Sequence, residues 1–118
     1  MSVARIIKSN LRDDVSEQEW QQRVDLAACY RLIAHFGWDD LIYTHISARL
    51  VDNPHHFLLN PYGLMFEEIT ASSLIKVGLD GSVITGSKYG FNPAGFVIHG
   101  AILDGRSDVS CVLHLHTD

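Results

Sequence analysis

The chain has 118 residues and a mass of 13.2 kDa, which corresponds to about one ordinary domain. Apolar residues make up 47% of it, enough to bury a hydrophobic core, so the composition excludes a disordered tail. Nine Lys and Arg stand against fourteen Asp and Glu, a net charge of −5 with no basic block and no long apolar run, so we expect neither nucleic acid nor a membrane as a partner.

Two further features bear on where the protein works. Its N-terminus reaches Lys8 and Arg12 too soon to resemble a secretory signal peptide. Cys29 and Cys111 lie in apolar stretches and are interpreted as small core residues rather than as a disulfide. We therefore expect a reducing, cytoplasmic setting.

A helix is predicted directly after a polar N-terminal arm at residues 1–15. Ser16 followed by Glu19 is the capping-box pattern, in which each side chain satisfies a free backbone N–H. Gly37 supplies the left-handed residue that commonly ends a helix. We assign residues 16–118 to the domain itself. An apolar stripe at helical spacing is expected to face its core: Trp20, Val24, Ala27, Ala28, Tyr30, Ile33 and Ala34.

A β-hairpin is predicted next. The alternating, β-branched segment at residues 41–51 is followed by turn residues at 52–54 and returns as residues 57–60. Because strand side chains alternate between faces, one face of the first strand is polar. That face points either to solvent or to a binding site, and it carries Tyr43, His45, Ser47 and Arg49.

The second half of the chain is predicted to add a hairpin, a helix and a strand. The hairpin joins residues 74–77 to 83–85, and a glycine-bounded loop follows at 86–90. Residues 92–105 are predicted as a helix, with Asn as N-cap and Pro in the first helical position. Residues 109–115 are apolar enough for an inner strand. This order indicates a mixed sheet covered by helices.

The His114-Leu115-His116 segment is the strongest candidate for chemistry. On a strand, positions i and i+2 point to the same side about 6.5–7 Å apart, so two imidazoles can converge on one metal ion. Leu115 would then face the core. The alternative is that both are half-buried histidines, hydrogen-bonded to neighbours near the end of a strand, because His-x-His alone is a weak motif.

The other histidines carry less weight. His35 and His99 lie within predicted helices and are expected to be packed or surface residues. His55 and His56 lie in a predicted turn and are expected to be solvated. His45 stays open between a functional role and simple exposure.

Four segments together resemble the class II aldolase/adducin family. They are residues 45–49 (HISAR), 59–63 (LNPYG), 92–105 and 109–116, and their order and spacing are similar to the family's from about Trp20 to the C-terminus. The resemblance implies an α/β fold: a three-layer α/β/α sandwich around a mixed, largely antiparallel sheet.

The resemblance also implies a site. His114 and His116 correspond to two of the three histidines that bind a divalent metal, usually zinc, and the third ligand is expected beyond residue 118. His45, Asn60 and Gly63 would line the substrate pocket. Enzymes of the family act on small hydroxy-carbonyl compounds, and the metal stabilises the enediolate formed when a carbon–carbon bond breaks. Members are commonly tetramers, so we expect a homo-oligomer.

Several positions depart from the family's enzymes. The aldolases carry an acidic residue where this chain has Gly95, and serines that hold phosphate where it has Pro93 and Ala94. A strand asparagine of the enzymes corresponds to His45, and the threonine of their phosphate loop corresponds to Tyr62. This chain therefore lacks residues that the enzymes use for general acid/base catalysis and for binding the substrate phosphate.

These departures leave two readings of function. One is a metal-dependent lyase or related enzyme on a small hydroxy-carbonyl substrate; the other is a non-catalytic, adducin-like module for oligomerisation or protein binding. The resemblance further predicts that residues 16–118 are roughly the first half of the family's domain, which would be incomplete at its C-terminus.

Overall fold

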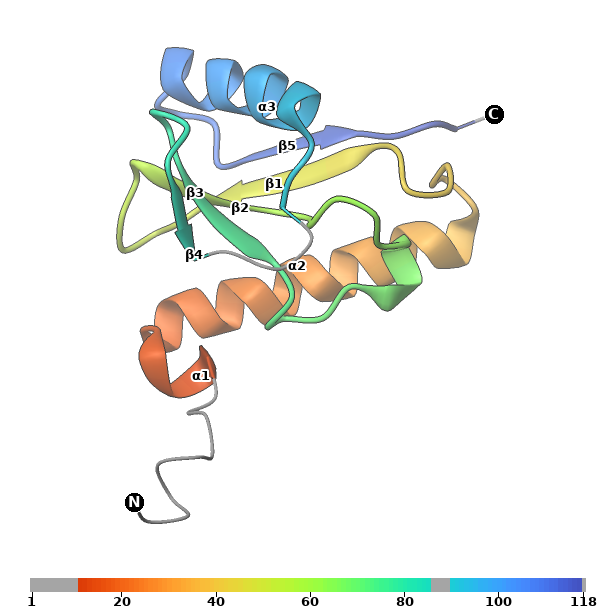
Figure 1. Cartoon of the computed structure of the whole chain (residues 1–118), viewed down its shortest axis with the longest axis horizontal. Helices are drawn as coiled ribbons and strands as arrows, with labels where there is room; N and C mark the ends of the chain where they lie inside the picture. Colours follow the sequence, from red (N-terminus) through yellow and green to blue (C-terminus); the bar gives the residue numbers. More distant parts are fainter. Residues whose placement is uncertain (1–10, 86–89, 118) are drawn as a thin grey trace.

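The computed structural model describes residues 11–85 and 90–117 (Figure 1). Residues 1–10 of the predicted arm and 86–89 of the predicted loop lie outside this range, as does residue 118. The helices and strands, in chain order, are α1 (Leu11–Asp14), α2 (Glu17–Phe36), β1 (His45–Arg49), β2 (His56–Leu59), the 3₁₀ turn η2 (Phe66–Glu68), β3 (Ile75–Gly78), β4 (Val83–Thr85), α3 (Pro93–Gly105) and β5 (Cys111–His114).

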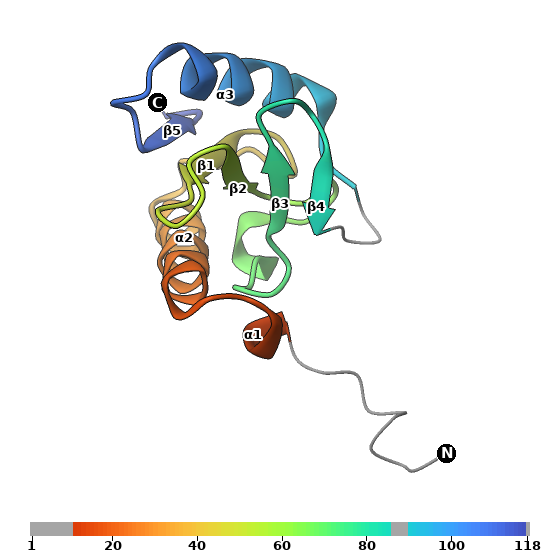
Figure 2. The same cartoon turned by 90° about the vertical axis from the view of Figure 1, so that its left-hand side faces the viewer.

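A five-stranded sheet in the order β4-β3-β2-β1-β5 forms the middle layer. Each ladder between the described strands is antiparallel, which agrees with the largely antiparallel sheet expected. Helix α2 lies on one face of the sheet and α3 on the other, as Figures 1 and 2 show. Leu58 of β2 packs in the cluster beneath α2, whereas Phe57 and Leu59 pack with Leu103 of α3. The sheet is therefore buried on both faces, and the predicted three-layer α/β/α fold is confirmed.

Helix α2 begins and ends where the sequence predicts. The Ser16 hydroxyl oxygen accepts the Glu19 N–H at 3.0 Å, and Gly37 has the left-handed φ of 74° that ends the helix. The Glu19 side chain has other partners than a capping box would give it: its carboxylate binds Arg23 at 3.0 Å and Lys76 at 2.8 Å. This group joins α2 to β3.

The buried face of α2 differs from the predicted apolar stripe. Val24 and Ala28 are exposed, whereas Leu26 and the charged Arg23 are buried. Arg23 is tolerated inside because its guanidinium donates to the Leu74 carbonyl at 2.8 Å and pairs with a carboxylate. The residues that α2 buries are therefore not simply its most hydrophobic ones. They are Glu19, Arg23, Leu26, Ala27, Tyr30 and Ile33.

Both hairpins form as predicted, but β1 is shorter than residues 41–51. It begins at His45 because Leu41 and Thr44 have positive φ angles of 53° and 72°, which break the extended conformation. The segment 37–44 is consequently a loop between α2 and β1.

The last strand corrects two predictions. Residues 109–115 were predicted as an inner strand, but β5 pairs with β1 alone and is the terminal strand of the described sheet. Leu113 is consequently 47% exposed, and Cys111 is exposed rather than in the core. Cys29 is half-buried, and burial raises the pKa of its thiol. Both cysteines are free and line a groove of about 290 Å³ between α2 and the β1–β5 edge.

None of the helices among residues 11–85 and 90–117 has the length and apolar character needed to cross a bilayer.

Candidate functional site

Four imidazoles lie in a row across α3, β1 and β5. The ring centroids are 5.5 Å apart from His99 to His45, 5.6 Å from His45 to His114, and 5.2 Å from His114 to His116. The β1–β5 register produces this arrangement because it places His45 directly opposite His114. The row runs from the buried underside of α3 to the exposed end of β5.

His114 and His116 lie on the exposed side of the β5 terminus, as the i, i+2 spacing predicts. Both are exposed, and Leu115 between them packs against the core cluster under α2. The His116 Nδ1 lies 2.9 Å from Asp40 Oδ2, and its backbone N–H donates to the Trp38 carbonyl at 3.1 Å. Two neighbouring, exposed imidazoles thus lie at the end of β5, and one of them contacts a carboxylate.

His45 is buried, which removes solvent exposure as the explanation of the polar strand face. Only 7% of it is accessible, because the first turn of α3 covers it. Asn92 Oδ1 accepts the Ala94 N–H at 3.0 Å, so its amide NH₂ faces His45 Nε2 at 3.3 Å. His45 Nε2 is therefore the acceptor and Nδ1 carries the proton. Burial and the nearby imidazoles of His114 and His116 lower the pKa of His45, so the ring is neutral.

Gly95 lies against that ring. A Cβ added at this position would lie 3.0 Å from His45 Cδ2 and 3.3 Å from its Cγ. The imidazole of His45 therefore occupies the space into which a side chain at position 95 would project. The position that carries an acid in the family's enzymes, by the resemblance above, is thus a glycine packed against the His45 ring.

His99 is a packed histidine, as expected. It is fully buried, and its Nδ1 lies 2.5 Å from Ser47 Oγ. Burial, followed by the imidazoles of His45 and His114, lowers the pKa of His99 to about 4. His99 Nε2 and His45 Nδ1 are both buried and have no hydrogen-bond partner among the described residues. His35, the other helix histidine, is on the surface beside Phe36.

Asn60 and Gly63 occupy the strand end and loop that follow β2. Asn60 is 4% exposed, and its Oδ1 accepts the Tyr30 hydroxyl at 3.0 Å. Gly63 has a φ of 95°, which favours glycine. The adjacent Tyr62 N–H donates to the Gly90 carbonyl at 3.0 Å, so this loop lies beside the segment that enters α3.

Sequence reasoning missed two residues of the site. Asn92 was identified only as a helix cap, although its amide also contacts His45. Asp40 belongs to none of the motifs described above, but its carboxylate lies 2.9 Å from His116 Nδ1. No local pattern indicates the second contact, because 76 positions separate Asp40 from His116.

The donor set at the sheet edge is chemically suited to a divalent transition metal. Imidazole nitrogen binds Zn, Cu, Fe and Ni, and a ligating histidine commonly donates its other N–H to a carboxylate, as His116 does to Asp40. Within residues 11–85 and 90–117 no three His, Cys, Asp or Glu side chains are grouped so as to hold an ion. A catalytic zinc takes three protein ligands, so His114 and His116 would supply two of them.

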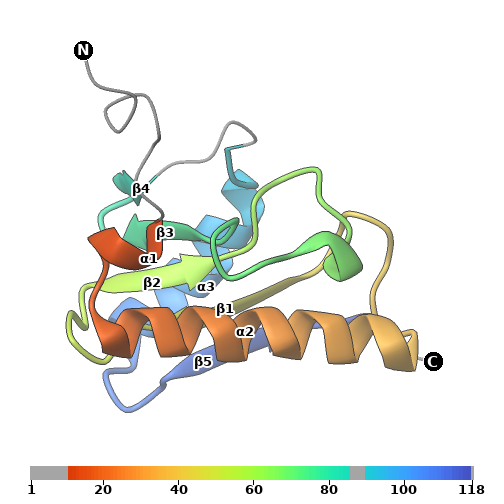
Figure 3. The same cartoon turned by 90° about the horizontal axis from the view of Figure 1, so that it is seen from below.

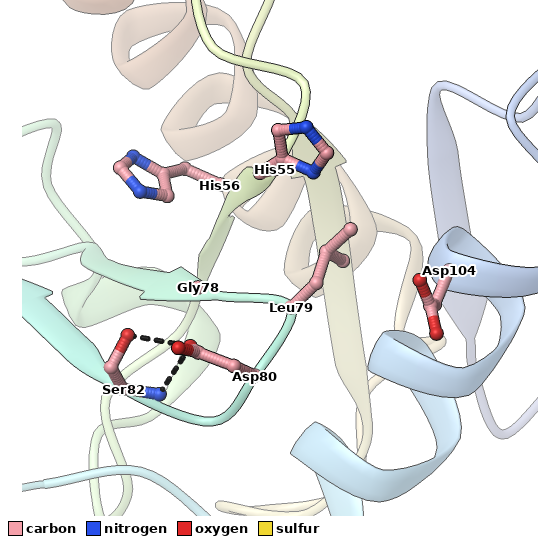
Figure 4. Close-up of a pocket in the computed structure, with 7 residues that line it drawn as sticks. All are labelled: His55, His56, Gly78, Leu79, Asp80, Ser82 and Asp104. Carbon is pink, nitrogen blue, oxygen red and sulfur yellow. Dashed lines mark hydrogen bonds between the residues drawn. The ribbon is translucent and has the colours of Figure 1, made fainter.

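A separate pocket of about 440 Å³ lies at the opposite end of the sheet (Figure 4). Asp80 there accepts hydrogen bonds from the Ser82 hydroxyl at 2.6 Å and the Ser82 N–H at 3.0 Å. The predicted site residues are absent from its lining, which consists of His55, His56, Gly78, Leu79, Asp80, Ser82 and Asp104. Of the two turn histidines, His55 is exposed, as expected, and His56 is half-buried.

Comparison with known proteins places these observations in one family. Residues 24–118 match the model of the "Class II Aldolase and Adducin N-terminal domain". A Caulobacter vibrioides protein named "Putative aldolase class 2 protein" is 61% identical over 109 residues, covering 92% of this chain and 42% of that protein. Rat alpha-adducin is 47% identical over 97 residues, covering 80% of this chain and 13% of that protein.

Solved structures agree. The aldolase II superfamily protein from Pseudomonas syringae superposes with a TM-score of 0.88 at 53% identity, covering 92% of this chain and 44% of that one. L-fuculose 1-phosphate aldolase from Glaciozyma antarctica gives a TM-score of 0.79 at 39% identity, covering 86% and 42%. The chain therefore spans less than half the length of the bacterial relative and of these two structures.

Proposed function

Because the chain belongs to the class II aldolase and adducin family, we propose that it serves as the metal-binding half of an aldolase-like enzyme acting on a small hydroxy-carbonyl, sugar-derived substrate. His114 and His116 would hold zinc or another divalent ion. The observation that carries the proposal is the pair of adjacent, exposed imidazoles, one of which is bound to a carboxylate at 2.9 Å. A cytoplasmic location would suit the free cysteines.

When bound, the ion supplies Lewis-acid stabilisation of the negative charge that develops on the substrate oxygens. The third ligand is expected beyond residue 118. Lys76 binds Glu19 at 2.8 Å, so this lysine is committed to an ion pair and not placed as a Schiff-base amine.

The chain's own residues would shape the substrate side of the site. His45 offers a buried, neutral imidazole next to His114, held by the Asn92 amide at 3.3 Å. Asn60 and Gly63 lie on the strand end and loop beyond β2, and we propose them with His45 as the pocket lining. Residues 90–98 include no Asp or Glu, so the acid of the family's enzymes has no counterpart in this segment and proton transfer would use another group.

A second function is favoured by two observations. Alpha-adducin matches 80% of this chain at 47% identity, and the position that carries the acid in the family's enzymes is Gly95. The alternative is therefore a non-catalytic, adducin-like module that oligomerises or binds a protein. In either case we expect self-association, because members of the family are commonly tetramers.

Metal analysis tests the proposal. We expect wild-type protein, purified without chelator, to bind zinc at one ion per chain or per site shared between chains. His114→Ala with His116→Ala should abolish this binding. The matched control is His55→Ala with His56→Ala, a histidine pair at the opposite end of the sheet, and it should bind zinc as wild type does. Failure of wild type to bind zinc would refute the metal-dependent function.

Turnover and assembly separate the two functions. Cleavage of a hydroxy-aldehyde or hydroxy-acid, lost in the His114/His116 variant, supports the enzyme. Stoichiometric zinc without turnover on any such compound supports the module. A strictly monomeric sedimentation profile at micromolar concentration would contradict the expected homo-oligomer.

A further inference from the structure

The loop between α2 and β1, residues 37–44, holds the end of β5 at the candidate metal centre. The Trp38 carbonyl accepts the backbone N–H of His116 at 3.1 Å, and Asp40 Oδ2 lies 2.9 Å from His116 Nδ1. Figures 1 and 3 show this loop beside the stretch that follows β5. One short segment therefore fixes both the backbone and the ring of His116.

The backbone of this loop determines where Asp40 points. Gly37 at its start, Leu41 and Thr44 all have positive φ angles, of 74°, 53° and 72°, which are uncommon for residues other than glycine. The Tyr43 N–H donates to the Asp40 carbonyl at 2.8 Å and closes a tight turn around Asp40. The carboxylate is thus held toward β5 by the local fold and not by packing, since its side chain is 48% exposed.

The contact has a definite consequence for the imidazole. A carboxylate accepts hydrogen bonds, so the proton of a neutral His116 ring must lie on Nδ1. The lone pair is then on Nε2, the nitrogen that is left to bind an ion. Hydrogen bonds of this kind fix the tautomer and the orientation of ligating histidines.

We infer that Asp40 is a positioning residue: it holds His116 in the Nδ1–H tautomer and aims Nε2 at the metal. The inference rests on the proposed function, because it concerns the same metal site. In this role Asp40 would act through His116 and would not itself be a ligand. His114, its neighbour in the ligand pair, is held differently, by the β5–β1 ladder opposite His45.

Zinc affinity of the intact chain, measured by competition with a chromophoric chelator, tests this role. Asp40→Ala is expected to weaken zinc binding by about 10–100-fold. Asp40→Asn should fall between this variant and wild type, because an amide oxygen still accepts the hydrogen bond but carries no charge. The matched control is Asp39→Asn, which removes the neighbouring carboxylate in the same loop and should leave the affinity unchanged.

A second readout does not depend on zinc. Nitrogen-15 NMR of the imidazoles in zinc-free protein should show His116 as the Nδ1–H tautomer in wild type and as a mixture in Asp40→Ala. The inference is overturned if Asp40→Ala binds zinc like wild type, if Asp39→Asn loses as much affinity, or if wild-type His116 is the Nε2–H tautomer. Wild type that binds no zinc would refute the proposed function and this role with it, whereas zinc-binding wild type matched by Asp40→Ala refutes this role alone.

Discussion

Replacing Gly95 by alanine tests whether the His45 ring fills the space beside α3. Alanine is favoured over glycine inside a helix by up to about 1 kcal/mol. The added Cβ, however, would lie 3.0 Å from His45 Cδ2, closer than the 3.5–4.0 Å or so of an ordinary carbon–carbon contact. Overpacking of this kind typically costs about 1–3 kcal/mol. We therefore expect Gly95→Ala to destabilise the fold by about 1–2 kcal/mol.

The ring has little freedom to relieve this contact. The His99 and His114 rings flank it at centroid distances of 5.5 and 5.6 Å, and the Asn92 amide holds its Nε2 at 3.3 Å. In a His45→Ala background the imidazole ring is absent, so only the higher helix propensity of alanine remains. Gly95→Ala should then raise the free energy of unfolding by about 0.5–1 kcal/mol. The two substitutions are thus predicted to couple with a reversal of sign.

Urea denaturation followed by far-ultraviolet circular dichroism measures the four free energies of unfolding in this cycle. The control is Gly105→Ala in the same helix, where an added Cβ meets nothing within 4 Å and no penalty is expected. Equal effects of Gly95→Ala with and without the His45 ring would refute the reasoning. By the same geometry, Gly95→Glu alone should not place a carboxylate in the site, because the ring occupies its path.

Two further predictions concern buried polar groups. Tyr30→Phe removes the hydroxyl that accepts the Ile46 N–H at 2.9 Å and faces two acceptors, the Ile46 carbonyl and, at 3.0 Å, Asn60 Oδ1; the buried groups left without this partner should lower the free energy of unfolding by about 2–4 kcal/mol, and an unchanged urea midpoint would contradict this. For His99, burial holds the folded-state pKa near 4, below its ordinary value of 6.5, so the unfolded chain binds the proton first. The free energy of unfolding should therefore keep its full value above about pH 6.5 and fall by about 3 kcal/mol as the pH drops toward 4. Urea midpoints that stay constant over that range would exclude a neutral buried ring.

Helix limits were predictable because they depend on contacts within a few residues. The Ser16 cap, the Gly37 stop and the Asn92 cap all form as the local pattern indicates. The two hairpins follow for the same reason, since each turn lies next to the strands it joins.

The buried face of α2 was less predictable. Arg23 is fully buried although its type favours the surface, because Glu19 and the Leu74 carbonyl satisfy its guanidinium. The first of these partners is one turn away, but the second precedes β3 and is 51 positions away in the sequence. A hydrophobic stripe therefore predicts that one face of a helix is buried. Which residues lie on that face depends on the distant groups that contact it in the folded structure.

The candidate site also has one part that local sequence predicts and another that it does not. The alternation of a strand is a local property, so His114-Leu115-His116 alone indicated two imidazoles on one side and an apolar side chain on the other. The resemblance to the family predicted more of the fold than any single motif did, and the comparisons confirm that resemblance.

Length, composition and local pattern determined that this chain has an apolar core, capped helices, two hairpins and a pair of strand histidines. Only the tertiary structure decided that β5 pairs with β1 among the described strands, that His45 is buried opposite His114, and that Asp40 reaches His116. The physical reason is the range of the interactions. Caps, turns and alternation act between neighbours in sequence, whereas the row of imidazoles and its carboxylate exist only after the sheet register and the α2–β1 loop bring distant segments together.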